Sequence, residues 1–189
     1  MLFRSATISV ALAVPAFPTF MLVQIMTGLD RTFGTSFFDA NLGGSGWLYA
    51  HLFWIMGHPE VYVILMPGVA VLMEIAPVFV RKPLFSYTAA VLGFAGITGL
   101  SVLVWAHHMY MSGWMPMLNG PFMVTTEMIS VPTGLIFLVL LGTLWRGNPW
   151  MKVPMLGVYA FLWNMLIGGI TGDRKSTRLN SSHLGISYA

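Results

Sequence analysis

The sequence contains no cysteine, which excludes disulfide bonds, thiolate metal sites and cysteine nucleophiles. Charge is also scarce, because only 8% of the 189 residues are Asp, Glu, Lys or Arg, whereas 57% are hydrophobic. A soluble domain of this length needs far more charge to cover its surface. Several apolar stretches are at least as long as the ~20 residues that cross a bilayer core. The composition therefore predicts an integral membrane protein.

Five apolar segments are long enough to be transmembrane spans, and lipid permits only helices for such segments. They cover residues 5–28, 47–79, 86–111, 121–145 and 153–172. We expect the prolines inside these segments to kink the helices rather than to end them. The predicted fold is an all-α, polytopic transmembrane helix bundle that occupies residues 1–172.

The last residues, DRKSTRLNSSHLGISYA (173–189), are polar and have no useful hydrophobic period. They resemble the translation, in one reading frame, of a common short-read sequencing adapter. We expect them to form a disordered tail without a functional role. Without this tail the chain has six basic and five acidic residues. This near-neutral balance argues against a nucleic-acid partner.

The basic residues of the connectors predict how the spans are oriented. Four of them follow the second and fourth segments: Arg81, Lys82, Arg146 and Lys152. Because Lys and Arg favour the cytoplasmic side, the second segment should run inward and the third outward. His58 and the adjacent pair His107 and His108 would then lie at similar depth, in the outer half of the membrane.

The second segment carries ionisable side chains, which are costly inside a membrane and mark functional sites there. His58 and Tyr62 are four residues apart and share one helix face, and Trp54 extends this face by a turn. Glu60 follows His58 by two residues and must therefore point in another direction.

The short connector between the second and third segments makes them expected neighbours, so His58, His107 and His108 can meet around one metal ion. Neutral imidazole suits copper, zinc and iron. A phenol beside a metal-bound histidine, here Tyr62, can supply both a proton and an electron, which favours oxygen chemistry over hydrolysis. His51 shares the His58 face but lies near the outer surface, and we interpret it as structural or interfacial.

Two motifs, HLFWIMGHPEVYVILMPG and VWAHHMYMSG, resemble the catalytic subunit (subunit I) of the heme–copper oxygen reductases, the cytochrome c and quinol oxidases. DRTFGTSFFD, ISVPTG and NMLIGGITG resemble other segments of that family in the same order. The resemblance covers residues 1–172 and implies an internal fragment with about five of the family's twelve helices.

The resemblance implies a terminal oxidase that reduces O2 to water at a heme–copper centre, coupled to proton uptake and translocation. Cytochrome c or quinol would donate the electrons. Other oxidase subunits and the lipid bilayer, in a bacterial inner membrane, would be the partners. The isolated fragment is expected to be inactive.

The resemblance also implies residue roles. The copper ligands would be His58, His107 and His108. Tyr62 would be joined covalently to His58 and would supply a proton and an electron, while Trp54 would pack against the copper site. Glu60 would gate protons that arrive through an uptake channel. The heme axial ligands of the family would lie outside this chain.

The chain departs from the family pattern in a second proton channel, to which Thr133 would belong. Ile136 stands where common members have a lysine, and Met73 and Glu74 stand where they have serine and histidine. The usual lysine channel is therefore not expected here.

A polar stripe offers a replacement for that channel. Thr126, Ser130 and Thr133 are spaced i, i+4 and i+7, and Glu74 lies near the cytoplasmic end of the second segment. One hypothesis is that these residues carry protons through bridging water. Hydrogen bonding between helices by small polar residues is an equally good interpretation.

Two other functions remain open from the sequence. One is a nitric oxide reductase with non-heme iron, against which Tyr62 argues and which the acidic residues near the channel keep open. The other is a transporter without a metal, in which the histidines and Glu60 form a proton pathway.

Overall fold

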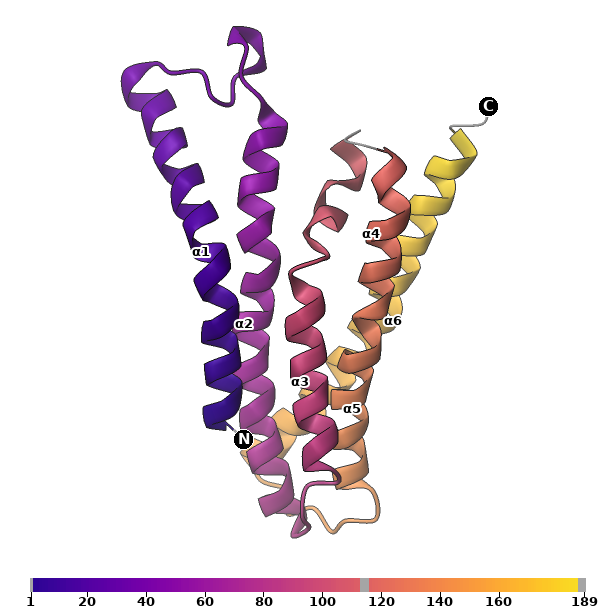
Figure 1. The fold of residues 1–189 in the computed structure, drawn as a ribbon. Coiled ribbons are helices and arrows are strands. Elements are labelled where there is room, and N and C mark those ends of the chain that lie inside the picture. The colour runs from indigo at the N-terminus through magenta and orange to yellow at the C-terminus, as the bar shows by residue number, and fades with distance from the viewer. Residues whose placement is uncertain (1, 113–115, 187–189) are drawn as a thin grey trace.

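The computed structural model describes residues 2–112 and 116–186, which form a bundle of helices (Figure 1). The elements are α1 (Leu2–Phe33), η1 (Ala40–Leu42), α2 (Gly46–Val80), α3 (Tyr87–Ser101), η2 (Trp105–Ser112), α4 (Pro116–Met128), α5 (Ser130–Leu144) and α6 (Val153–Ile186), where η marks a 3-10 helix. No strand occurs in these residues. The predicted all-α class is confirmed.

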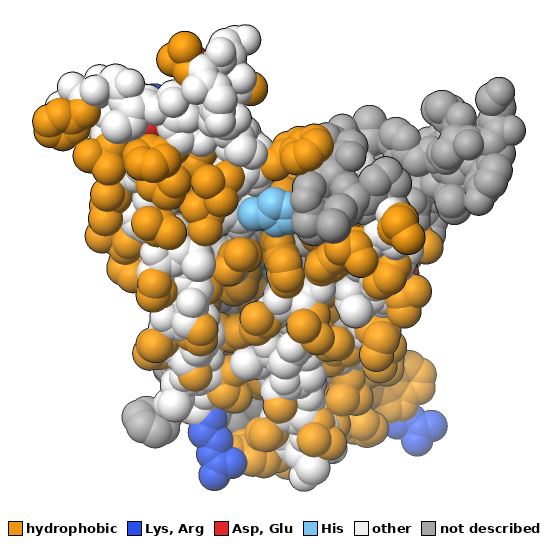
Figure 2. Space-filling view, turned by 45° about the horizontal axis from the view of Figure 1, so that its top comes forward, with side chains coloured by type: hydrophobic (Ala, Val, Ile, Leu, Met, Phe, Trp, Pro, Cys, Tyr) orange, Lys and Arg blue, Asp and Glu red, His pale blue; other side chains and the backbone are white. Residues whose placement is uncertain are grey.

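The chain alternates in direction through the bundle. The N-terminus and the α2–α3 and α5–α6 connections lie at the lower end of Figure 1, and the α1–α2 connection lies at the upper end. Figure 2 shows hydrophobic side chains over much of the visible surface and lysine and arginine gathered at the lower end. The basic connectors therefore share one end of the bundle, as the sequence predicted.

Helix α2 carries the central motif and has clear signals at both ends. The Ser45 side chain accepts a hydrogen bond from the backbone N–H of Leu48 and caps the N-terminus. Arg81 ends the helix in the left-handed conformation, with φ of 58°, and its N–H donates to the carbonyl of Pro77. The helix continues through Pro59 and Pro67, as expected for prolines inside a span.

Four helical stretches are long and apolar enough to cross a membrane: Val10–Phe33, Gly46–Val80, Met117–Leu144 and Val153–Thr171. The third predicted span needs a correction, because its α-helix α3 has only 15 residues and ends at Ser101. Residues Trp105–Ser112 continue it as a 3-10 helix. Together α3 and η2 replace the single α-helix expected over residues 86–111.

The fourth predicted span corresponds to the stretch Met117–Leu144, in which Ile129 is a single turn residue between α4 and α5. Pro132 explains the weak point, because it has no N–H to donate to the carbonyl of the residue four positions earlier. The backbone N–H of Thr133 does donate to Ile129 at 3.3 Å, so the chain re-enters a helix directly.

A hydrophobic core below the histidines holds α2, α3, α5 and α6 together. Met66 and Met73 of α2 are buried in it with Ile97 of α3 and Leu140 of α5. Ile136, which the resemblance places where common family members have a lysine, is 4% exposed and belongs to this core. The structure therefore fills that position with packed apolar atoms.

Helix α6 continues to Ile186, although we expected the residues after Gly172 to be disordered. The stretch from Asp173 to His183 contains no proline and no glycine, so nothing in it ends a helix. The membrane-crossing part of α6 ends at Thr171, close to the predicted limit of the bundle. The origin of the tail from an adapter stays a prediction, and residues 187–189 lie outside the described residues.

Candidate metal centre

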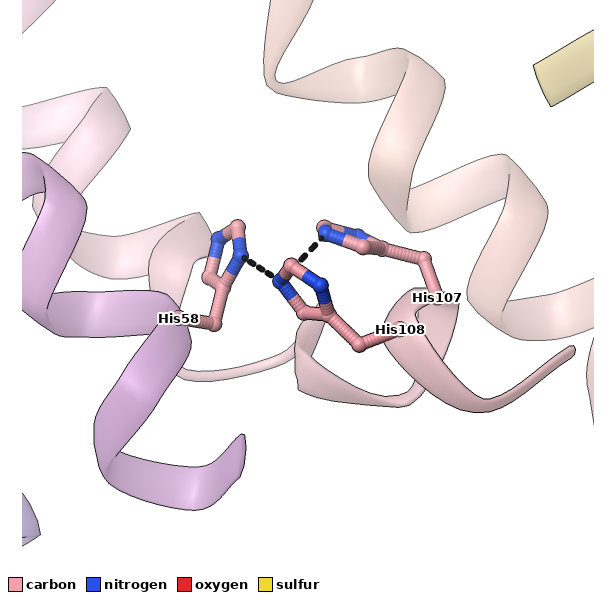
Figure 3. A group of neighbouring side chains, drawn as sticks. All are labelled: His58, His107 and His108. Carbon is pink, nitrogen blue, oxygen red and sulfur yellow. Dashed lines mark hydrogen bonds between the residues drawn. The ribbon is translucent and has the colours of Figure 1, made fainter. Parts of the chain in front are cut away.

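Three imidazoles from two segments meet near the upper end of the bundle. His58 lies on α2, and His107 and His108 lie on η2 (Figure 3). Nδ1 of His58 is 3.2 Å from Nε2 of His108, which is 3.1 Å from Nε2 of His107. One ring nitrogen of each residue lies within 4.8 Å of the other two. The structure thus brings together the three histidines that the sequence suggested as ligands.

The spacing of these nitrogens fits a shared metal ion. Metal–imidazole bonds are about 2.0–2.1 Å long, so two nitrogens on one ion at near-tetrahedral angles are about 3.0–3.5 Å apart. The two short nitrogen–nitrogen distances fall within this interval. The donor set of three neutral imidazoles suits copper, zinc or iron.

Thr126 of α4 fixes which nitrogen of His107 carries the hydrogen. Its hydroxyl donates to the carbonyl of Phe122 at 2.6 Å, and a hydroxyl has only one hydrogen. The contact of 3.1 Å between Thr126 Oγ1 and His107 Nδ1 must then be donated by the ring. Nε2 of His107 is left with a lone pair that faces the other two histidines, which is the tautomer that a metal ligand needs.

Hydrogen bonding alone cannot satisfy the cluster. Nε2 of His107 has no hydrogen, and Nε2 of His108 carries one at most. Among neutral rings, at most one of the two short contacts can then be a well-formed hydrogen bond, and the other stays unsatisfied. A cation at the shared point would accept a lone pair from each ring and would satisfy all three nitrogens.

Helix η2 brings two adjacent histidines to the same point. A 3-10 helix has three residues per turn, so successive side chains are about 120° apart. The rings of His107 and His108 nevertheless lie side by side, with centroids 4.3 Å apart, because both bend toward α2. His58 is buried, His107 is half-buried and His108 is exposed, so the cluster is open on the His108 side.

Trp54 supports the ring of His108. The two rings are stacked, with centroids 3.7 Å apart and planes within 3° of parallel. Since Trp54 lies one turn before His58 on α2, the same helix both contributes one imidazole and holds another in place. This is the position at which the sequence predicted a packing tryptophan.

Tyr62 lies against the other side of His58. The ring centroids are 4.9 Å apart in an edge-to-face arrangement. Nε2 of His58, the nitrogen not turned toward His108, is buried and has no hydrogen-bond partner in the described part of the chain. Tyr62 is half-buried. The phenol and the free nitrogen of His58 are therefore part of one site.

Glu60 and Glu74 are not part of this cluster. At 3.6 residues per turn, Glu60 is turned about 200° and Glu74 about 160° from His58 around α2. Both are exposed, whereas His58 is buried. The two carboxylates therefore share the face of α2 that points away from the histidines.

The hydroxyls of the predicted polar stripe differ in the groups that they contact, and their role as a proton route with Glu74 stays a prediction. Thr126 reaches His107, whereas Ser130 and Thr133 line a crevice of about 230 Å³ between α5 and α6. Ser130 donates to the carbonyl of Glu127 and Thr133 to that of Ile129. The sequence analysis missed the bond between Thr126 and His107, which joins residues that no local pattern connects.

We predict that Thr126→Val weakens metal binding by about tenfold, because the hydrogen bond that orients a metal-bound histidine contributes on that scale. Thr126→Ser keeps the hydroxyl and should bind the metal as the unchanged protein does. The measurement is the metal retained by the purified protein against increasing chelator. Thr133→Val is the matched control, and equal retention in both valine variants would contradict the assignment.

Comparisons with known proteins agree with this geometry. The family described as "Cytochrome C and Quinol oxidase polypeptide I" matches residues 1–181. The chain is 41% identical over 162 residues to "Cytochrome c oxidase subunit 1" of Bacillus subtilis, which covers 86% of this chain and 26% of that protein.

Two further relatives give the same result. "Probable quinol oxidase subunit 1" of Staphylococcus haemolyticus is 42% identical over 165 residues, with 87% of this chain and 25% of the relative covered. "Probable cytochrome c oxidase subunit 1-alpha" of Streptomyces coelicolor is 42% identical over 173 residues, with 92% and 29% covered. The chain thus spans between a quarter and a third of the length of these relatives. With a family match over nearly its whole length, this chain belongs to the family of cytochrome c and quinol oxidase subunit I.

Proposed function

We propose that this chain is the part of a terminal oxidase subunit that holds copper, at a heme–copper centre where O2 is reduced to water. The observation that carries the proposal is the meeting of three imidazole nitrogens beside Tyr62. Membership of the oxidase family supports it. The heme and its axial ligands would come from parts of the protein outside this chain.

The copper ligands would be Nδ1 of His58 and Nε2 of His107 and His108, the three nitrogens that face one another. Bound copper would supply an electron and a place for oxygen to bind. Thr126 keeps His107 in the tautomer that ligation needs, and Trp54 keeps the ring of His108 in its plane. Tyr62 would donate a proton and an electron from its phenol.

The first test is the metal content of the full-length protein. We expect one copper at this site in the unchanged protein and its loss in His107→Ala, because two imidazoles hold the ion far more weakly than three. Glu60→Gln is the control, since Glu60 lies on the far face of α2 and should leave the copper in place. Iron in place of copper would favour the nitric oxide reductase, and no metal would favour the transporter.

A second test concerns the contact between His58 and Tyr62. We propose that Nε2 of His58 bonds to a ring carbon of Tyr62, which explains why this buried nitrogen has no hydrogen-bond partner. The bond replaces one N–H and one ring C–H, and the two electrons and two protons released reduce O2 to hydrogen peroxide.

Mass spectrometry of the peptide that contains both residues checks this bond. We expect the peptide to be lighter by two hydrogen atoms than its sequence predicts. The same peptide from Tyr62→Phe should have its full mass, because phenylalanine lacks the phenol that activates the ring. An unmodified peptide from active, copper-loaded protein would contradict the covalent bond.

Proton supply is proposed to involve the carboxylates on the far face of α2. Glu60 would pass protons toward the copper site, and Glu74, four turns further along the same face, would take them up from the cytoplasmic side. Thr133 and Ser130 would belong to a separate route that follows the crevice beside α6.

Glu74→Gln tests the uptake step, because glutamine keeps the size of the side chain but cannot release a proton. We expect reduction of the metal site in the full-length protein to slow by about tenfold or more, the scale of a lost general acid. Thr133→Val, measured in the same way, separates the two routes. An unchanged rate in Glu74→Gln would remove Glu74 from the pathway.

The remaining partners follow from the family. Cytochrome c or quinol would donate electrons, because both kinds of oxidase occur among the relatives. Other oxidase subunits would surround the bundle within the lipid bilayer. The bacterial relatives support a bacterial inner membrane as the location.

A further inference from the structure

Helix η2 carries two of the three proposed ligands, yet its backbone gives it little rigidity of its own. Eight residues is long for a 3-10 helix, whose hydrogen bonds are poorer than those of an α-helix. The segment follows the end of α3 at Ser101 after only three residues. The direction of His107 and His108 must therefore be set by side chains that anchor η2 to its neighbours.

One such anchor is the contact between Trp105 and His51. The indole N–H of Trp105, the first residue of η2, donates to Nδ1 of His51 on α2 at 3.4 Å. The Trp105 ring also packs edge-to-face on Phe122 of α4, with centroids 5.1 Å apart. Trp105 thus links η2 to both helices that flank it.

His51 lies on the same face of α2 as the residues of the proposed metal site. His51, Trp54, His58 and Tyr62 follow one another at spacings of three, four and four residues, so they form one stripe along the helix. His51 contacts Trp105, Trp54 stacks on His108, and His58 contacts both His107 and His108. The α2–η2 contact is therefore held at its outer end by His51.

We propose that His51 is a positioning residue for the metal centre. By accepting the hydrogen bond of Trp105, it fixes the rotation of η2 about its axis and hence the direction of the His107 and His108 rings. The sequence had suggested only a structural or interfacial role for this histidine. The proposal rests on the proposed function, because it assumes that these rings bind copper.

The test compares copper affinity in five variants of the full-length protein, measured as copper retained against a chelator. His51→Leu removes the acceptor, and Trp105→Phe removes the donor but keeps a ring against Phe122. Each should weaken copper binding by about fivefold, the value of one ordinary hydrogen bond. The double variant should bind copper no more weakly than either single variant, because each single substitution already removes the same hydrogen bond.

His51→Asn provides the rescue, since its amide oxygen can accept at about the position of Nδ1, and it should bind copper as the unchanged protein does. Trp150→Phe makes the same chemical change as Trp105→Phe at the other end of the bundle, where Trp150 stacks on Phe79, and should have no effect. A thermal unfolding curve for each variant identifies those that are not folded.

The outcomes separate this inference from the proposed function. Normal copper binding in His51→Leu, additive losses in the double variant, or failure of His51→Asn to restore binding would each overturn the role of His51. If the unchanged protein binds no copper, the proposed function itself fails. If His51→Leu does not fold, copper binding by His51→Asn and Trp105→Phe still tests the role of His51.

Discussion

The site depends on the contact between α2 and η2, two segments whose histidines are 50 residues apart in the sequence. Neither segment can bind a metal with three imidazoles by itself. Helix α2 is much longer than η2, with 35 residues against eight, so its position can determine where η2 packs. The stack of Trp54 on His108 and the hydrogen bond from the His107 ring to Thr126 then hold one nitrogen of each imidazole close to the other two, an arrangement that suits a shared cation.

The hydrophobic core holds α2 in a fixed position. The buried residues of α2 from Met66 to Val80 lie on the C-terminal side of His58 and pack against α3, α5 and α6. The metal cluster lies beyond this core and is more open, with His108 exposed. Packing thus fixes the lower part of the bundle, while polar and aromatic contacts determine the upper part.

The sequence was sufficient to predict the helical class, the alternating topology and the three histidines, because long apolar runs and basic connectors reflect constraints of the membrane itself. It could not predict that the third span ends at Ser101, since apolar composition is the same in an α-helix and a 3-10 helix.

Contacts across the bundle were equally hidden from the sequence. The spacing of Thr126, Ser130 and Thr133 suggested one stripe, but Thr126 contacts His107 whereas Ser130 and Thr133 line the crevice beside α6. The bond between Thr126 and His107 joins two different segments, and only the packed structure places their side chains together.

The two faces of α2 have a consequence for how charge moves through the protein. His58 and Glu60 are only two residues apart along the chain, yet the helix backbone lies between their side chains. A helix with its side chains is about 10 Å across, so a carboxyl on one side cannot hand a proton directly to a group on the other. Any such transfer would have to pass around the helix, through water or through groups contributed by neighbouring helices.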